Sequence, residues 1–172
     1  MLRTAWIGAA AVLVLGAMVG FLASAPDHGK ELSKEAVVDY SRSGSAVPLV
    51  ELESADFGVL KPWFSNKIGF APPTIDLRNY GYELTGGRVA LLGKRSVVAL
   101  VYKRADAVLV IYCWPPNQEP MGYSERSADG YRVYLWANSQ CNYVLVERSN
   151  DPKISQFVDS FQDQSGAGAV SY

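Results

Sequence analysis

Two neighbouring stretches of the chain, residues 96–102 (SVVALVY) and 107–114 (AVLVIYCW), are apolar at nearly every position. Strands with one wet face alternate apolar and polar residues. These two stretches do not alternate, so we expect both of their faces to be covered. Their β-branched and aromatic residues favour strands. We therefore predict that they are the central strands of a sheet and that the rest of the chain covers them.

Strands are also expected on both sides of this central pair. Residues 86–92 lead through Gly93 and Lys94, a two-residue hairpin turn, into the first central strand. Residues 131–137 and 141–148 form a second hairpin near the end of the chain. The pattern thus predicts an antiparallel sheet of about five strands.

Two other segments have a weaker strand pattern. Residues 47–51 have the composition of a short edge strand, where Pro48 is tolerated. Residues 115–130 are rich in proline and glycine and form the longest irregular stretch. Loops of this length are uncommon unless they are functional or mobile. This stretch is therefore expected to be a loop, and a ligand pocket beneath it is one hypothesis.

Helical periodicity is found in three segments. The first, residues 31–42, has one apolar face. The second begins at Lys61-Pro62, because proline is favoured at the first helical position, and Gly69 ends it. The third is capped by Asn150 or Asp151. Its apolar residues follow the i, i+3, i+4, i+7 spacing of a helix, at Ile154, Phe157, Val158 and Phe161.

Together these elements predict one α+β domain over residues 31–164, an antiparallel sheet with helices packed on it. Residues 165–172 are mostly small, and we expect them to be a disordered tail. A composition of 49% hydrophobic and 19% charged residues is typical of a globular chain. The net charge of -1 gives no electrostatic reason to expect a nucleic-acid partner.

The first 25 residues of the chain determine where in the cell we expect the protein to be. Residues 5–25 carry no charge, and about 20 apolar residues suffice for a helix to span a bilayer. A cleaved signal peptide is the alternative, since residues 23–25 (ASA) match an A-x-A cleavage site. Pro26 follows that site directly, and the apolar run is long for a signal peptide. We therefore favour a retained transmembrane anchor.

The positive-inside rule orients this anchor. Arg3 places residues 1–4 in the cytoplasm, so the linker at 26–30 and the following domain lie on the other side of the membrane. Gly16 and Gly20 have the G-x-x-x-G spacing of packed membrane helices and are candidate packing residues, or else simple small-residue filler.

The two cysteines fall at strand ends. Cys113 is near the end of one predicted strand, and Cys141 begins another. Outside the cytoplasm such a pair can form a disulfide. In a simple meander these two strand ends need not be close, so we favour two buried free thiols, with the disulfide as the alternative.

The chain lacks the residue sets that common catalytic chemistries need. Its single histidine, His28, falls in the linker, whereas a nucleophile–histidine pair needs it deep in the domain. Zinc needs three or four convergent ligands, more than one histidine and two strand cysteines supply. The glycines at 86–87 lack the spacing of a phosphate loop. We predict no enzyme, no metal site and no cofactor.

Tryptophan residues are the strongest binding candidates. Tryptophan buries a large area and keeps a polar group, which favours it at interfaces. Trp63, Trp114 and Trp136 are therefore candidate partner-binding residues, with core packing as the alternative for each. Trp114 lies at a strand end beside the proline-rich stretch, and we expect it to be exposed.

Several segments, in the same order, resemble the extracytoplasmic domain of bacterial transmembrane anti-sigma factors. They are VLKPWFSNKIGFAPP (59–73), LTGGRVALL (84–92), VALVYKR (98–104), WP (114–115) and GYRVYLW (130–136). The resemblance covers about residues 31–163. It implies a periplasmic domain that senses or binds, whereas in those proteins a cytoplasmic zinc-containing segment holds the sigma factor. Within the matched segments we expect Pro62 to start a helix, Gly86 and Gly87 to shape a turn, and Trp63 to pack.

Only residues 1–4 precede the expected anchor, so we expect this chain to lack the sigma-binding segment. The predicted function is a non-catalytic, membrane-anchored protein-interaction or regulatory domain in the periplasm, at the bacterial inner membrane. Its expected partners are the bilayer and a protein. Two alternatives remain open: an accessory subunit of a larger respiratory or transport complex of that membrane, and a periplasmic small-ligand binder.

Overall fold

The computed structural model of the chain describes residues 27–43, 45–46, 48–74, 76–78, 81–105, 107–116, 121–148, 153–154 and 156–160. Two labelled helices are present, α2 (His28–Arg42) and α3 (Phe57–Ile68). Seven strands form one sheet: β1 (Leu52–Glu53), β2 (Glu83–Leu92), β3 (Arg95–Arg104), β4 (Ala107–Trp114), β5 (Ser124–Ala128), β6 (Tyr131–Ala137) and β7 (Asn142–Glu147).

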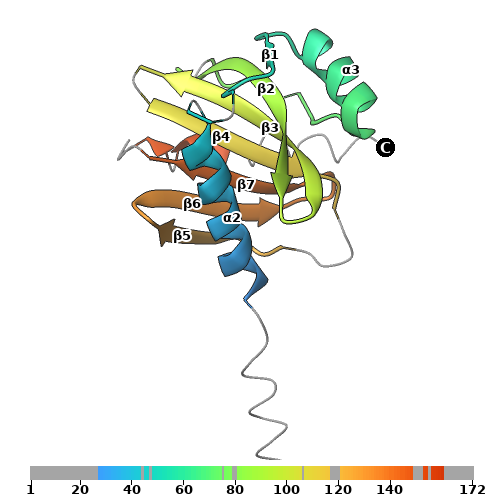
Figure 1. The fold of residues 1–172 in the computed structure, drawn as a ribbon. Coiled ribbons are helices and arrows are strands. Elements are labelled where there is room, and N and C mark those ends of the chain that lie inside the picture. Colours follow the sequence, from blue (N-terminus) through green and yellow to red (C-terminus); the bar gives the residue numbers. More distant parts are fainter. Residues whose placement is uncertain are drawn as a thin grey trace, which may run out of the picture.

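The strand order is β1-β2-β3-β4-β7-β6-β5, and every pairing is antiparallel (Figure 1). The predicted α+β class with an antiparallel sheet is therefore confirmed. The last strand in the chain, β7, lies in the middle of the sheet between β4 and β6. The chain crosses over once to reach β5, so the sheet is not a simple meander.

The prediction of about five strands missed two short edge strands. Strand β1 lies at Leu52–Glu53, directly after the segment 47–51 that the sequence suggested. Strand β5, with the sequence SERSA, lies inside the predicted loop 115–130 and has a half-buried, half-exposed alternation. Each of these strands pairs with only one neighbour, so neither needs the apolar run that marks a central strand.

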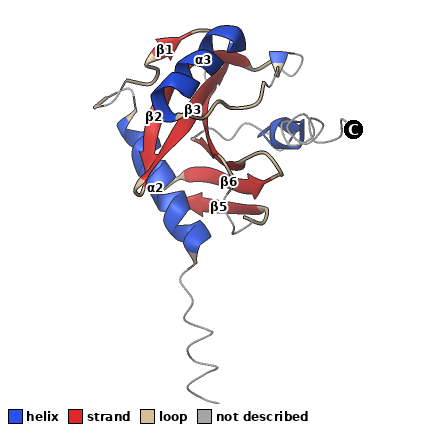
Figure 2. Ribbon diagram, turned by 90° about the vertical axis from the view of Figure 1, so that its right-hand side faces the viewer, coloured by secondary structure: helices blue, strands red, loops and turns tan. Residues whose placement is uncertain are grey.

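Both faces of the sheet are covered, as the two non-alternating strands predicted. Alternate residues of β3 point to opposite sides: Val97, Ala99 and Val101 join the core under α2. Val98, Leu100 and Tyr102 join the core on the other face, with α3 and the helical residues near the end of the chain. Helix α2 runs across the strands of its face (Figure 1), and Figure 2 shows it from the side.

Helix α2 begins three residues earlier than expected. The Asp27 carboxylate accepts a hydrogen bond from the backbone N–H of Lys30 at 3.1 Å and so caps the helix. This cap turns most of the expected linker 26–30 into the first turn of α2. His28 is therefore the first residue of a helix rather than part of a linker.

Helix α3 begins at Phe57, so the prediction that Pro62 starts it is wrong. The Asp56 carboxylate caps the helix by accepting from the N–H of Gly58 at 2.7 Å, and Pro62 lies inside the helix. Asp56 is an equally good N-terminal signal, and it acts earlier in the chain. Gly69 ends the helix in the left-handed conformation, with φ 70°, as predicted.

The last predicted helix is confirmed where the structure describes it. Ile154 and residues 156–160 are helical. Ile154, Phe157 and Val158 are buried in the core on the α3 side of the sheet. Phe161 and the expected tail at 165–172 lie outside the described residues.

The expected anchor lies outside the described residues as well. This holds for residues 1–4, for residues 5–25 and for the candidate packing glycines Gly16 and Gly20. Within the part of the chain that the structure describes, no helix is long and apolar enough to cross a membrane.

Candidate functional site

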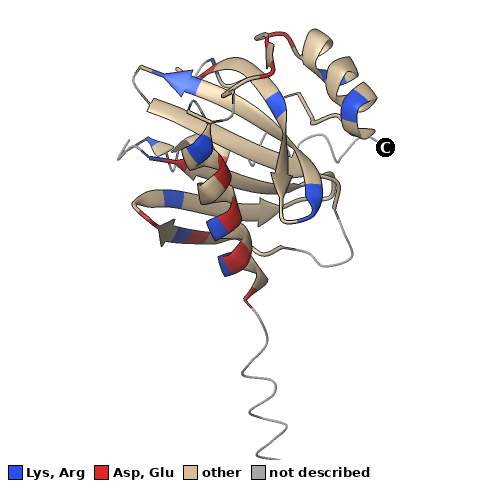
Figure 3. Ribbon diagram, viewed as in Figure 1, with Lys and Arg blue, Asp and Glu red and all other residues tan. Residues whose placement is uncertain are grey.

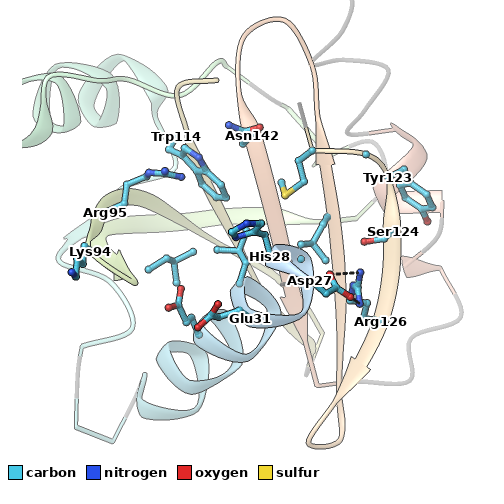
Figure 4. A pocket seen from close by; sticks show the side chains of 17 residues that line it. Asp27, His28, Glu31, Lys94, Arg95, Trp114, Tyr123, Ser124, Arg126 and Asn142 are labelled. Atoms are coloured by element: carbon cyan, nitrogen blue, oxygen red, sulfur yellow. Dashed lines mark hydrogen bonds and ion pairs between the residues drawn. The ribbon is translucent and has the colours of Figure 1, made fainter. Parts of the chain in front are cut away.

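A cavity of about 910 Å³ opens where three segments meet at one end of the sheet (Figure 4). The N-terminal turns of α2 form one wall, the tip of the β2–β3 hairpin forms a second, and residues 121–124 with the start of β5 form a third. Residues 121–124 and 126 of the stretch 115–130, where the sequence suggested a pocket, line the cavity. Its volume is in the range of small-ligand sites.

Trp114, the last residue of β4, lies in the wall of this cavity. Its exposed fraction is only 3%, so the expectation that it is exposed is wrong. The Arg95 guanidinium lies over the indole ring, 5.4 Å from the ring centroid, in a cation–π arrangement. The indole Nε1–H is buried and has no hydrogen-bond partner. A buried donor without an acceptor is costly, and such atoms are rare in folded proteins.

Charges of both signs surround the cavity (Figure 4). The hairpin tip contributes Lys94 and Arg95, and α2 contributes Glu31 and Glu35. Figure 3 shows basic residues at that hairpin tip and charges of both signs along α2.

Asp27 and Arg126 close the far side of the cavity. Arg126 donates from both terminal nitrogens to the Asp27 carboxylate, at 2.9 and 3.1 Å. The hydrogen bond from the Lys30 backbone N–H is the main cause that lowers the pKa of Asp27; burial opposes it, and Arg126 adds to the lowering. This pair links the first turn of α2 to the edge strand β5, so it fixes the width of the cavity at this side.

The remaining lining is mostly apolar. Leu32, Leu92, Met121 and Leu135 come from α2, β2, the segment before β5, and β6. Asn142 donates to the carbonyl of Pro115 at 3.3 Å, which ties the start of the stretch 115–130 to β7. Sequence reasoning missed most of these residues, because each belongs to a different element and only the sheet order brings them together.

Helix α2 is held over the sheet by a buried polar cluster at its C-terminal part. Arg88 is 1% exposed and forms an ion pair with Asp39 of α2. It also donates to the Ser43 hydroxyl at 2.8 Å, and the Tyr112 hydroxyl donates to Asp39 at 2.7 Å. Burial and the Asp39 carboxylate raise the pKa of Tyr112. Arg88 was part of the recognised segment 84–92, but nothing in the sequence paired it with α2.

The three candidate tryptophans do not share a site. Trp136 lies on the opposite face of the sheet from Trp114, where its ring stacks on Tyr143 with 5.0 Å between centroids. Trp63 of α3 is half-buried and packs edge-on against Phe64, with the Lys67 ammonium 5.5 Å from its ring centroid. Trp114 alone lines the cavity.

Cys113 and Cys141 lie close together, although in a simple meander the two strand ends would not need to be close. Strand β4 pairs with β7, so Cys113 lies opposite Tyr143, two residues after Cys141. Both thiols are free and buried in the core on the α3 side. Burial raises the pKa of each thiol, and the neighbouring Cys141 adds to the rise at Cys113.

A second cavity, of about 690 Å³, lies beside the N-terminus of α3. The Tyr102 hydroxyl lines it, and it is buried without a hydrogen-bond partner. At the rim, Asp76 and Arg78 form an exposed ion pair, and hydrogen bonds from Arg78 lower the pKa of Asp76 to about 2.

Metal binding has no arranged site among the described residues. They contain no group of three or more His, Cys, Asp and Glu side chains that could hold an ion. His28 lines the large cavity at the start of α2.

Comparisons of the chain with protein-family models, with curated proteins and with solved structures find no match. The resemblance to anti-sigma factor domains therefore remains a prediction.

Proposed function

We propose that this chain is a non-catalytic, membrane-anchored regulatory domain in the periplasm, at the bacterial inner membrane, and that it binds its signal in the large cavity beside the start of α2. One observation carries the proposal. A ligand-sized cavity with a buried, unpartnered indole N–H lies at the helix that directly follows the expected anchor.

The position of the cavity suggests how binding would reach the membrane. Asp27 and His28 line the cavity, and they follow the end of the expected anchor at 5–25 by two and three residues. A ligand there contacts the first turn of α2, while Arg88 and Tyr112 hold the C-terminal part of the same helix on the sheet through Asp39. Occupancy therefore acts on the short segment between the domain and the anchor.

The anchor is tested by fractionation of the native cells. We expect the full-length chain to stay in the membrane after a high-salt wash. An externally added protease should reach the domain only after the outer membrane has been permeabilised. A mature protein that begins after residue 25 and leaves the membrane in salt would disprove the anchor and leave the cavity to be judged separately.

The binding role is tested with a photo-cross-linking amino acid at two exposed positions. Tyr123, at the cavity, has an exposed fraction of 60%, and Val59, on α3, has 47%. If the cavity is the interaction site, the cross-linker at position 123 captures one partner reproducibly and the cross-linker at 59 does not. Capture from position 59 alone contradicts the proposal.

Mild-detergent purification of the tagged chain from its native membranes distinguishes the signalling role from the remaining alternative, an accessory subunit of a larger complex. Recovery of a large membrane complex in a fixed ratio would make the chain an accessory subunit. Recovery of a sigma-pathway protein would support the signalling role that the resemblance implies.

A further inference from the structure

We propose that the large cavity binds an organic carboxylate carrying an apolar body, with the carboxylate held between the Arg95 guanidinium and the indole N–H of Trp114. This inference rests on the proposed function, because it names the chemical class that the same cavity takes.

The indole N–H of Trp114 is the first argument. Trp114 lines the cavity, and its indole N–H is buried and lacks an acceptor within the described part of the chain. An indole can only donate, so the missing partner must be an acceptor. A ligand that supplies this acceptor removes a desolvation cost already present in the empty site, which makes the donor favourable for binding.

Arg95 determines the charge of that acceptor. Its guanidinium lies against the Trp114 ring, so a group that accepts from the indole also comes close to a positive charge. Carboxylates match the planar donors of a guanidinium, and hydrogen bonds to charged groups are stronger than those between neutral groups. Lys94, the neighbouring residue in the hairpin tip, adds a second cation to the same wall.

The other charged residues of the cavity decide where on this wall an anion can bind. Asp27 and Arg126 neutralise each other through two hydrogen bonds. Glu31 and Glu35 belong to α2, and the Glu35 carboxylate reaches the tip of the β2–β3 hairpin, where a Cβ on Gly93 would lie 3.2 Å from its Oε1. In the view of Figure 4, Glu31 lies on the α2 side of His28, and Trp114 lies on the β4 side. The carboxylate position is therefore between Arg95 and Trp114, at the wall of β3 and β4, rather than at the hairpin tip beside Glu35.

The apolar lining determines the rest of the ligand. Leu32, Leu92 and Leu135 lie beside Trp114 in the lining of the cavity, and Met121 adds an adaptable side chain at its edge. A cavity of about 910 Å³ has room for an aromatic or branched aliphatic body behind the carboxylate. Such a ligand has two natural sources, a free carboxylic acid and the C-terminal residue of a peptide, and both present the same chemistry to Arg95 and Trp114.

Three probes that share a phenylpropyl body and differ only in their polar head group test whether the cavity prefers a carboxylate. The full-length chain in lipid nanodiscs is titrated with 3-phenylpropanoate, 3-phenylpropylamine and 3-phenylpropanol, and affinity is measured by calorimetry. We expect the carboxylate to bind about tenfold more tightly than the alcohol, as one charge-assisted hydrogen-bonded contact implies, and the amine to bind most weakly. In the same titration the indole N–H NMR signal of Trp114, one of four tryptophans and assigned with Trp114→Phe, should shift.

Two variants and a matched control locate the contact. Trp114→Phe keeps an aromatic ring and removes the N–H, and Arg95→Gln keeps much of the side-chain length and removes the charge. Each should weaken carboxylate binding about tenfold while the alcohol is unaffected by Arg95→Gln. Lys67→Gln removes the equivalent cation from the ring of Trp63 on α3 and should change nothing. Unchanged thermal unfolding of each variant shows that the fold persists.

A peptide pair distinguishes the two sources. An acetylated tripeptide ending in phenylalanine is compared with its C-terminal amide. Tighter binding of the tripeptide acid than of 3-phenylpropanoate, with loss in the amide, identifies a peptide C-terminus, and the reverse order identifies a free acid. Both results support the inference.

Four outcomes overturn the inference: equal affinity for the three head groups, tightest binding of the amine, a Trp114 signal that does not move, or no binding by any probe. These outcomes are distinct from failure of the proposed function. If position 123 still captures a partner but no carboxylate binds, the regulatory role stands and the ligand class is wrong. If the carboxylate binds but the chain is not anchored, the ligand class is right and the membrane-anchored role is wrong.

Discussion

Two adjacent glycines determine how closely β1 and α3 approach the sheet. Gly86 has φ 153°, and a Cβ there would lie 2.3 Å from the carbonyl oxygen of Leu52 in β1. A Cβ on Gly87 would lie 2.6 Å from the ring of Phe64, a fully buried residue of α3. These glycines lie inside β2, next to a register shift, so the expectation that they shape a turn is wrong. Their role is to leave room for other elements.

Gly87→Ala should therefore destabilise the domain by about 1–3 kcal/mol, the usual cost of overpacking a core. Urea unfolding measures the change. Gly122→Ala is the control, because a Cβ at that position would have no atom within 4 Å. Combining Gly87→Ala with Phe64→Leu should give less than the sum of the two single losses, since the shorter side chain removes the closest contact. Additive losses would show that the ring is not the obstacle.

The two buried thiols should lower the stability of the domain as the pH becomes alkaline. Burial raises the pKa of Cys113 well above its ordinary value of 9.0, so the native state keeps a proton that the unfolded chain releases. The native state then binds more protons than the unfolded state, and stability falls as pH rises. The contribution is fully present below the ordinary thiol pKa and is lost above it.

We expect the free energy of unfolding to decrease from about pH 8.5 upwards, before the tyrosines begin to titrate. Cys113→Ala should reduce this slope, whatever its effect on stability at neutral pH. Urea titrations across this range give the measurement, under reducing conditions. The same slope in both proteins would contradict burial of a protonated thiol, and mass mapping without reductant would detect a disulfide directly.

At the scale of elements, two side chains from the sheet hold the C-terminal part of α2: Arg88 from β2 and Tyr112 from β4. Arg88 reaches Asp39 and Ser43, and Tyr112 of β4 donates to the same carboxylate. Helix α2 also provides a wall of the large cavity. The position of that wall therefore depends on a buried ion pair formed by residues far apart in sequence.

Arg88→Met should destabilise the domain by about 3–5 kcal/mol, because it leaves the Asp39 carboxylate beneath α2 without its cation. The double variant Arg88→Met/Asp39→Asn should lose less than the sum of the single changes, which shows that the two residues are coupled. Arg78→Met breaks an exposed ion pair and should have little effect, since surface pairs contribute little. Equal effects of Arg88→Met and Arg78→Met would contradict the role of Arg88.

The elements differ in how much of them the sequence could reveal. The central strands were predictable because a strand covered on both faces has no polar alternation, and β3 and β4 have none. Helix α2 was predictable from its apolar face. Strand β5 was not, because SERSA is an edge strand whose only partner is β6. The start of α3 was not predictable from Pro62, because Asp56 is a second N-terminal signal and it is the one that caps the helix.

For the whole molecule, the sheet order was the decisive unknown. Sequence patterns report local structure, whereas the pairing of β4 with β7 joins residues about thirty positions apart. This pairing brings Cys141 near Cys113, and the crossover to β5 brings Arg126 to Asp27. The cavity follows from the same order, because its walls belong to α2, the β2–β3 hairpin and the segment before β5. Only the suggestion of a pocket under 115–130 was available from the sequence.

Native-state hydrogen exchange tests this order across the whole sheet. Amides of β7 should exchange as slowly as those of β3 and β4, because β7 is paired on both sides and its residues 142–147 are all buried. Amides of β5, paired on one side and half exposed, should exchange much faster. A meander would place β7 at an edge of the sheet, where its amides would exchange as fast as those of β5. That result would refute the crossover, and with it the cavity whose walls the crossover brings together.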